Sequence, residues 1–276
     1  NKYNNTFIFF ISDYWNSFHQ TRAIATYAEN VAALDNASYD AIWDAARQYN
    51  RNLCSRSNSF LLSEEQKAEY ESLLDISGQG VMGYIEIPEI DVSLPIYHGT
   101  DAEVLDRGVG HLLGSSLPVG GENTHSILSG HSGMASQKMF TDLEQLTAGD
   151  VFYLHVLNET LAYQVVEINT VLPYDTSLLG IAPGEDLCTL VTCTPYGVNT
   201  HRLLVRGSRI PYEEAEQLME ETASEEAAAS TWEEKYLQGV ILGIAAALVL
   251  ILVIAIGAQI YQSIAGSSGG NGHAKQ

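Results

Sequence analysis

Basic side chains are scarce in this sequence. Its 276 residues include 13 Lys and Arg against 34 Asp and Glu, which gives a formal net charge of −21. Proteins that bind nucleic acid need clustered Lys and Arg to neutralise phosphates, so we expect no nucleic-acid partner. The simplest interpretation of the acidity is a solvated exterior that keeps the folded chain soluble.

Cysteine is rare too, and paired metal-ligand motifs are missing. The chain has three cysteines, so at least one stays unpaired and a full disulfide framework is excluded. No His-x-x-x-His or Cys-x-x-Cys pair occurs, and such pairs are typical of zinc sites. A metal site would have to be assembled from residues distant in sequence, for which the candidates are His98, His111, His125, His131 and Cys193. We therefore expect neither a metal nor another cofactor.

Long apolar runs are absent except for one. Residues 240–258 are nineteen consecutive apolar or glycine residues, which span about 28 Å as a helix and match a bilayer core of about 30 Å. Aromatic side chains flank the run, as at membrane interfaces. We expect a transmembrane helix at residues 237–261. Residues 6–11 are too short to span, and belong either to a longer hydrophobic segment or to a staple for the following helix.

The orientation of this span is inferred from its flanks. The tail at 262–276 carries Lys275 as its one basic residue, and the approach to the span is strongly acidic. Because basic residues mark the cytoplasmic side, a short cytoplasmic tail and an extracellular main domain are favoured. The expected localisation is the cell membrane, with a single-pass C-terminal anchor.

The remainder of the chain changes character near residue 78. Before it, residues 15–50 show helical periodicity with a break at Asp35, and residues 64–74 fit a further short helix. After it come seven short β-rich runs separated by Gly, Pro and Asn turns, at residues 83–87, 92–97, 124–129, 151–156, 161–171, 187–192 and 202–209. This spacing predicts a mainly β domain, closed or nearly closed as a barrel.

These segments define five expected parts of the chain. They are an N-terminal helical region (1–77), a β-barrel domain (78–212), an acidic tether (213–236), the transmembrane helix (237–261) and the tail (262–276).

Cys193 is the last residue of a predicted strand before a Pro/Gly turn. Its thiol should therefore lie at the rim of the sheet, on the same face as Thr189 and Val191. A hairpin return would bring Arg202 beside it, and a fixed cation nearby favours the nucleophilic thiolate. Arg also has directed donors for an oxyanion. A buried structural cysteine fits the spacing equally well.

His131 lies between two glycines at the exit of an apolar strand, in Leu-Ser-Gly-His-Ser-Gly. An imidazole presented there could act as a general acid for a departing amine. For any one of the eight histidines in the chain, a surface or capping role is the more ordinary alternative.

These motifs together resemble the sortase family. The sequence Thr-Leu-Val-Thr-Cys ending at Cys193 resembles the Thr-Leu-x-Thr-Cys signature of sortases, and Arg202 and His131 match the positions of that family's arginine and histidine. GYIEIP at 83–88, LPIYHGT at 94–100 and TPYGVNTHR at 194–202 resemble the class C, pilus-building sortases. The resemblance runs in order over residues 14–212.

The resemblance implies an eight-stranded sortase-type β barrel preceded by helices, and a cysteine transpeptidase. Cys193 would attack the Thr–Gly bond of an LPxTG-like sorting signal, Arg202 would hold the oxyanion and His131 would protonate the leaving amine. The thioester would then pass to an amine acceptor, such as a pilin lysine. Thr192 would help to shape the substrate groove.

Class C relatives also carry a lid with an Asp-Pro-aromatic tip, to which Asn58, Ser59 and Phe60 are the nearest match. Phe60 could cover Cys193, whereas Asn58 lacks the charge to pair with Arg202. We expect a weaker or more mobile lid. Cys188, on the opposite strand face from Cys193, is expected to be an inert core thiol, and Cys54 could form a redox link to another thiol.

Three functions remain open at this point. The first is a transpeptidase that polymerises LPxTG-bearing pilins. The second is a sortase that anchors surface proteins to a peptidoglycan precursor, or a related cysteine protease that releases product to water. The third is a non-catalytic, membrane-tethered surface β domain, which gives no reason for Cys193, His131 and Arg202 to meet.

Overall fold

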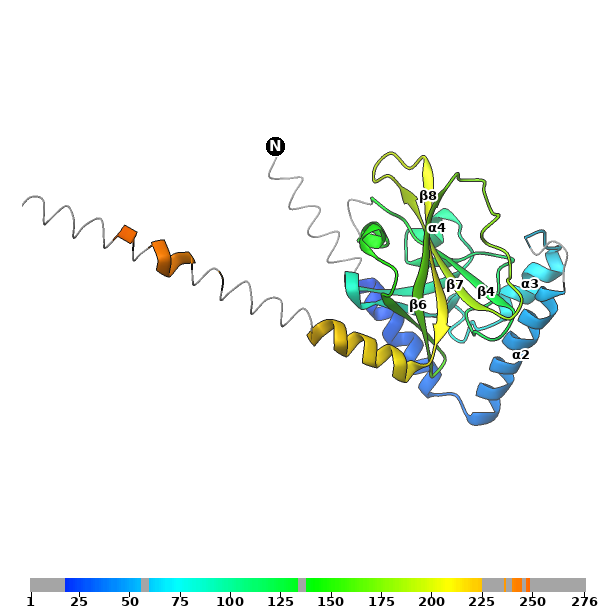
Figure 1. Cartoon of the computed structure of the whole chain (residues 1–276). Helices are drawn as coiled ribbons and strands as arrows, with labels where there is room; N and C mark the ends of the chain where they lie inside the picture. The colour runs from blue at the N-terminus through cyan, green and yellow to red at the C-terminus, as the bar shows by residue number, and fades with distance from the viewer. Residues whose placement is uncertain are drawn as a thin grey trace, which may run out of the picture. The chain divides into compact units, whose positions relative to one another are not determined.

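The computed structural model describes residues 18–55, 60–133, 138–224, 236, 240–244 and 247–248. Within this part of the chain, eight strands close into a barrel in the order β1-β2-β3-β4-β7-β8-β6-β5 (Figure 1). The strands are β1 Val81–Ile87, β2 Val92–His98, β3 Val109–His111, β4 Thr124–Ser129, β5 Val151–Val156, β6 Glu159–Val171, β7 Asp186–Thr194 and β8 His201–Ile210. Short helical turns connect them, at η1 Pro88–Ile90, α4 Ala102–Leu105 and η2 Thr141–Gln145.

The seven predicted strands are all present, and the eighth is β3. Strand β3 has three residues centred on Gly110, too few to show a two-residue alternation of polarity. It pairs in parallel with β2, as β4 does with β7, whereas the other neighbours pair antiparallel. The result is a mixed barrel of eight strands, as the family resemblance implied.

The two faces of β7 belong to different apolar clusters. Cys188 and Leu190 lie in the large core cluster that also contains Val205 of β8. Val191 belongs instead to a smaller cluster built around Ile127 and Leu204. Because side chains alternate along a strand, Cys193 shares the face of Val191 and points away from the barrel core.

Two long helices precede the barrel, as predicted. The first occupies residues 18–32, and α2 (Asn36–Cys54) follows it. Asp35 caps α2 by accepting a hydrogen bond from the backbone N–H of Ser38, which explains why the helical pattern breaks there. A third helix, α3 (Glu64–Ser72), begins with a capping box between Ser63 and Gln66.

Helices α2 and α3 pack against one side of the barrel (Figure 1). Trp43, Leu53 and Tyr70 lie in the same core cluster as the barrel interior. The Asn50 side chain fixes the register of α2, because it donates to the Leu117 carbonyl at 3.0 Å and accepts from the Leu117 N–H at 2.7 Å. The helices are therefore part of the folded domain.

After β8 the chain continues into a helix at residues 212–224. The chain divides into two compact units, Asn1–Leu218 and Met219–Gln276. The predicted membrane segment at 237–261 lies mostly outside the described residues, as do residues 6–11 and Asn58. Among the residues that the structure describes, no helix combines the length and apolarity needed to cross a bilayer.

Candidate active site

The β7–β8 hairpin places Cys193 and Arg202 side by side. The two residues are direct partners in the antiparallel register, with Thr192 opposite Leu203 one step further in. The turn between them is stabilised by N–H groups of Val198 and Asn199 that donate to the Pro195 carbonyl at 3.0 Å. Both Cys193 and Arg202 are partly exposed, so a substrate can reach them.

The Arg202 guanidinium is held by backbone groups. Its Nη1 donates to the His201 carbonyl at 3.0 Å and lies 3.4 Å from the Asn199 carbonyl oxygen. Within the described part of the chain it forms no ion pair with a carboxylate. Most of its donors thus remain available to an oxygen that gains negative charge near Cys193.

His131 is brought to the same rim by hydrogen bonds on both sides of it. Gly130 N–H donates to the Val191 carbonyl at 3.0 Å, and the Ser132 hydroxyl donates to the Cys193 carbonyl at 2.6 Å. The segment that carries His131 is therefore attached to β7 directly beside the thiol. Position 130 requires glycine, because a Cβ there would lie 2.7 Å from the Phe140 ring.

A carboxylate faces the imidazole from another element. Asp106, just after α4, has its Oδ1 3.8 Å from His131 Nε2, and both side chains are partly or largely exposed. This partner was not identified from the sequence, because nothing in the pattern around residue 106 marks it as close to His131.

Thr192 contributes to the site indirectly. It is 2% exposed, on the core side of β7, and its hydroxyl donates to the Gly130 carbonyl at 2.8 Å. The side chain therefore shapes the site by positioning the His131 segment, and it does not line the surface around Cys193.

Phe60 lies on the outer face of the barrel, next to the strand that carries Cys193. It packs on the apolar cluster formed by Ile127, Leu179 and Leu204, to which Val191 also belongs. Val191 precedes Cys193 by two residues on the same face, so Phe60 shares an apolar cluster with a residue of the Cys193 face. Asn58, the other residue of the predicted lid tip, lies outside the described residues.

The other thiols and the buried histidines have different surroundings. Cys188 is fully buried and burial raises its pKa well above the usual value, as expected of an inert core thiol. Cys54 is exposed, and none of the three cysteines forms a disulfide. His111 and His125 are buried and hydrogen-bonded to backbone carbonyls, at Ser116 and Gly180 respectively. Among the described residues no group of three or more His, Cys, Asp or Glu could hold a metal.

Known proteins are similar to this chain in sequence and in fold. Residues 85–210 match the model of the sortase domain family. The chain is 32% identical to sortase D of Bacillus subtilis over 151 residues, which cover 54% of this chain and 73% of that protein. It is 30% identical to sortase A of Staphylococcus aureus over 182 residues, 64% of this chain and 84% of the relative.

Solved structures give a closer likeness. Sortase C1 of Streptococcus agalactiae is 49% identical with a TM-score of 0.68, covering 69% of this chain and 98% of that one. Sortase C of Clostridium perfringens, solved with the C-terminal cell wall sorting motif, is 45% identical with a TM-score of 0.62, over 69% and 99% of the two chains. Sortase C of Streptococcus pneumoniae is 43% identical with a TM-score of 0.62, over 69% and 97%.

Proposed function

The chain belongs to the sortase family of cysteine transpeptidases and is similar to its class C, and we propose that Cys193, Arg202 and His131 are its catalytic residues. The observation that carries this assignment is the β7–β8 register that pairs Cys193 with Arg202, together with the hydrogen bonds from Gly130 and Ser132 to β7. A nucleophile, an oxyanion donor and a proton donor are thus available on one rim.

The first half of the reaction is an acyl transfer to the enzyme. The Cys193 thiolate attacks the carbonyl carbon of the substrate threonine, and the Arg202 guanidinium stabilises the oxyanion that forms. The carbon–nitrogen bond to glycine then breaks, and protonated His131 gives its proton to the leaving amine. A thioester between Cys193 and the threonine remains.

The second half regenerates the enzyme. An incoming amine attacks the thioester carbonyl, His131 accepts the proton, and the carbon–sulfur bond breaks to release the Cys193 thiolate. Asp106, 3.8 Å from His131 Nε2, could pair with the imidazolium that is present before the first half and formed again in the second.

The substrate proposed is an LPxTG-like sorting signal on a pilin, cleaved between Thr and Gly, with a pilin lysine as the acceptor. Two similar structures support the substrate class: that of C. perfringens sortase C is described with a C-terminal cell wall sorting motif, and that of S. pneumoniae sortase C in terms of pilin substrate specificity. Anchoring of surface proteins to a peptidoglycan precursor is the second candidate, favoured by the similarity to sortase A proteins.

We further propose a membrane-anchored enzyme. The apolar run at residues 240–258 supports a transmembrane helix at 237–261, preceded by the acidic tether at 213–236 and followed by a short cytoplasmic tail. The barrel at 78–212 would then work outside the cell, with residues 1–77 supplying the helices and the lid.

A peptide assay tests this function. The purified chain should cleave a peptide containing Leu-Pro-x-Thr-Gly and join the fragment to an added amine, and Cys193→Ala should abolish both reactions. Cys188→Ala is the matched control and should keep activity, because Cys188 lies on the opposite face of β7. Supplying a pilin domain or a cell-wall peptide as acceptor separates the two candidates. Cleavage by Cys193→Ala at the parent rate would contradict the catalytic assignment.

A further inference from the structure

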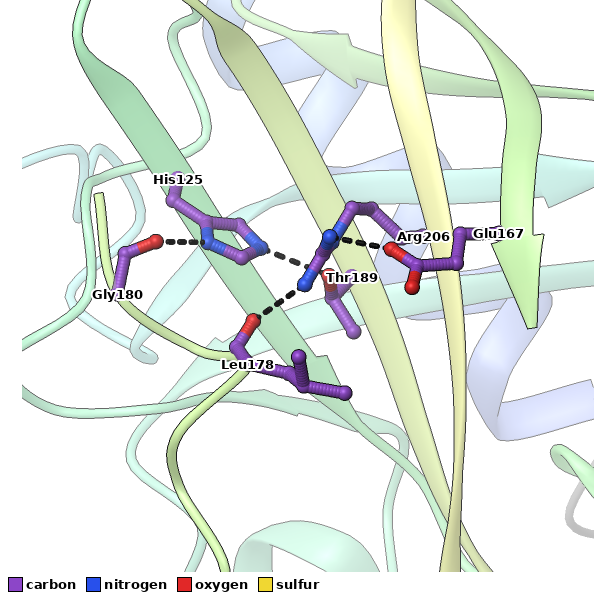
Figure 2. Close-up of polar contacts among 6 residues, drawn as sticks. All are labelled: His125, Glu167, Leu178, Gly180, Thr189 and Arg206. Atoms are coloured by element: carbon purple, nitrogen blue, oxygen red, sulfur yellow. Dashed lines mark hydrogen bonds and ion pairs between the residues drawn. The ribbon is translucent and has the colours of Figure 1, made fainter. Parts of the chain in front are cut away.

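A network of polar side chains holds the loop that joins β6 to β7. This loop, residues 172–185, runs over the outer face of the barrel (Figure 2). The network draws side chains from four strands: His125 of β4, Glu167 of β6, Thr189 of β7 and Arg206 of β8. None of these side chains has a part in the transpeptidation steps described above.

Arg206 attaches the loop at one point. Its Nη2 donates to the Leu178 carbonyl at 2.7 Å, while its Nη1 pairs with the Glu167 carboxylate. The register places Glu167 directly opposite Arg206 on the neighbouring strand, so the carboxylate orients the guanidinium toward the loop. The Arg206 side chain is 20% exposed and that of Glu167 is 42% exposed, so the guanidinium is the more desolvated of the two partners.

His125 attaches the loop at a second point, two residues further on. Its Nδ1 lies 2.8 Å from the Gly180 carbonyl, and its Nε2 lies 2.7 Å from the Thr189 hydroxyl. A carbonyl can only accept, so Nδ1 carries the proton and Nε2 accepts from Thr189. Burial lowers the pKa of His125 to about 4, with a smaller contribution from the Arg206 charge, so the imidazole is neutral near pH 7.

Both contacts use main-chain carbonyls of the loop, so its side chains can pack elsewhere. Leu178 and Leu179 pack on the apolar cluster that contains Val191 and Leu204. Val191 is two residues before Cys193 and Leu204 two residues after Arg202, each on the same strand face. The part of the loop held by these contacts therefore lies beside the strand faces that carry Cys193 and Arg202, in the same apolar cluster as Phe60.

We propose that Arg206 and His125 are positioning residues that hold the 172–185 loop as the fixed wall of the groove that receives the sorting signal. This proposal rests on the function proposed above. With the wall held in place in the free enzyme, the peptide does not have to order the loop when it binds, which lowers KM. The chemical step uses other residues, so kcat should depend little on the contacts of Arg206 and His125 with the loop.

Kinetics with the full chain and the Leu-Pro-x-Thr-Gly peptide tests the proposal. Arg206→Met keeps the length of the side chain but loses both contacts, so KM should rise about tenfold while kcat changes by less than about threefold. Arg206→Lys retains the charge but cannot reach Glu167 and Leu178 with a planar fork, so its KM should be intermediate. Arg209→Met is the control, because Arg209 lies on the same strand but its guanidinium stacks on Tyr163 of β6.

Amide hydrogen exchange measures how firmly Arg206 and His125 hold the loop, without any substrate. Amides of residues 176–182 should exchange faster in Arg206→Met and His125→Gln, while amides of β7 keep their protection. This result stands even if the peptide is not cleaved, so failure of these contacts to hold the loop and failure of the proposed function can be told apart. Unchanged loop exchange, or a KM within about twofold of the parent in both folded Arg206 variants, would overturn the proposal.

Discussion

The Thr192 hydroxyl links the strand of the nucleophile to the segment of the proposed acid. It donates to the Gly130 carbonyl at 2.8 Å from a buried position. Removal of the donor leaves this carbonyl with one partner fewer in a desolvated setting, a loss of about 1–3 kcal/mol. The segment bearing His131 would then be held less firmly against β7.

We therefore expect Thr192→Val, which keeps the shape of the side chain, to lower kcat for peptide cleavage by about tenfold. Thr192→Ser restores the hydroxyl and should recover most of the rate. The measurement is steady-state kinetics with the sorting-signal peptide, accompanied by a thermal melt to confirm folding. If Thr192→Val keeps the parent kcat, the hydrogen bond to Gly130 does not position His131.

At this scale, the sequence identified residues whose types and neighbours form a motif. Cys193, Arg202 and His131 were recognised in that way, and strand alternation placed Cys193 on one face with Thr189 and Val191. Asp106 and Arg206 were missed because their partners, His131 and Leu178, are distant in sequence. Such pairings depend on how non-neighbouring strands close the barrel, which local patterns do not encode.

We propose that Phe60, at the element scale, covers part of the site. Phe60 packs on the cluster of Ile127, Leu179 and Leu204 beside the face of Cys193. Phe60 is partly buried there, so its contact contributes less than the roughly 1.5–3 kcal/mol of a fully buried aromatic ring. The weaker lid predicted from the missing Asp-Pro pair still has this apolar contact.

Phe60→Ala should thus raise the rate of Cys193 alkylation by iodoacetamide about tenfold, because the segment loses its anchor on the cluster. The reaction needs a Cys54→Ser background, since Cys54 is also exposed, whereas Cys188 is buried. Leu61→Ala is the matched control, because Leu61 is adjacent but 77% exposed. An alkylation rate equal to that of the parent would exclude a lid role for Phe60.

Sequence patterns predicted the elements well where the elements were long. Seven strands and three helices follow from polarity patterns and caps, including the break at Asp35. Strand β3 was not predicted, because three residues around Gly110 are too few to show a periodicity. The parallel pairing of β4 with β7, which brings His131 to Cys193, could come only from the family resemblance or from the structure.

The folded domain buries two histidines, His111 and His125, which stay neutral. Burial lowers the pKa of His111 and of His125 from 6.5 to about 4 each. Below pH 6.5 the unfolded chain takes up protons that the folded chain does not, so stability decreases as pH falls from about 6.5 toward 4. His155 adds in the same direction, because burial lowers its pKa also.

Acidification from pH 7 to 5.5 should therefore remove about 1 kcal/mol of unfolding free energy for each of the two histidines, in a range where most carboxylates stay ionised. Urea titration followed by tryptophan fluorescence measures this, because Trp43 lies in the core. His125→Gln should be less stable at pH 7 but lose about 1 kcal/mol less than the parent on acidification. An unfolding free energy that stays constant or rises from pH 7 to 5.5 would mean that these imidazoles become protonated within the folded barrel. The assignment of a neutral His125, which the hydrogen bond from Thr189 requires, would then be wrong.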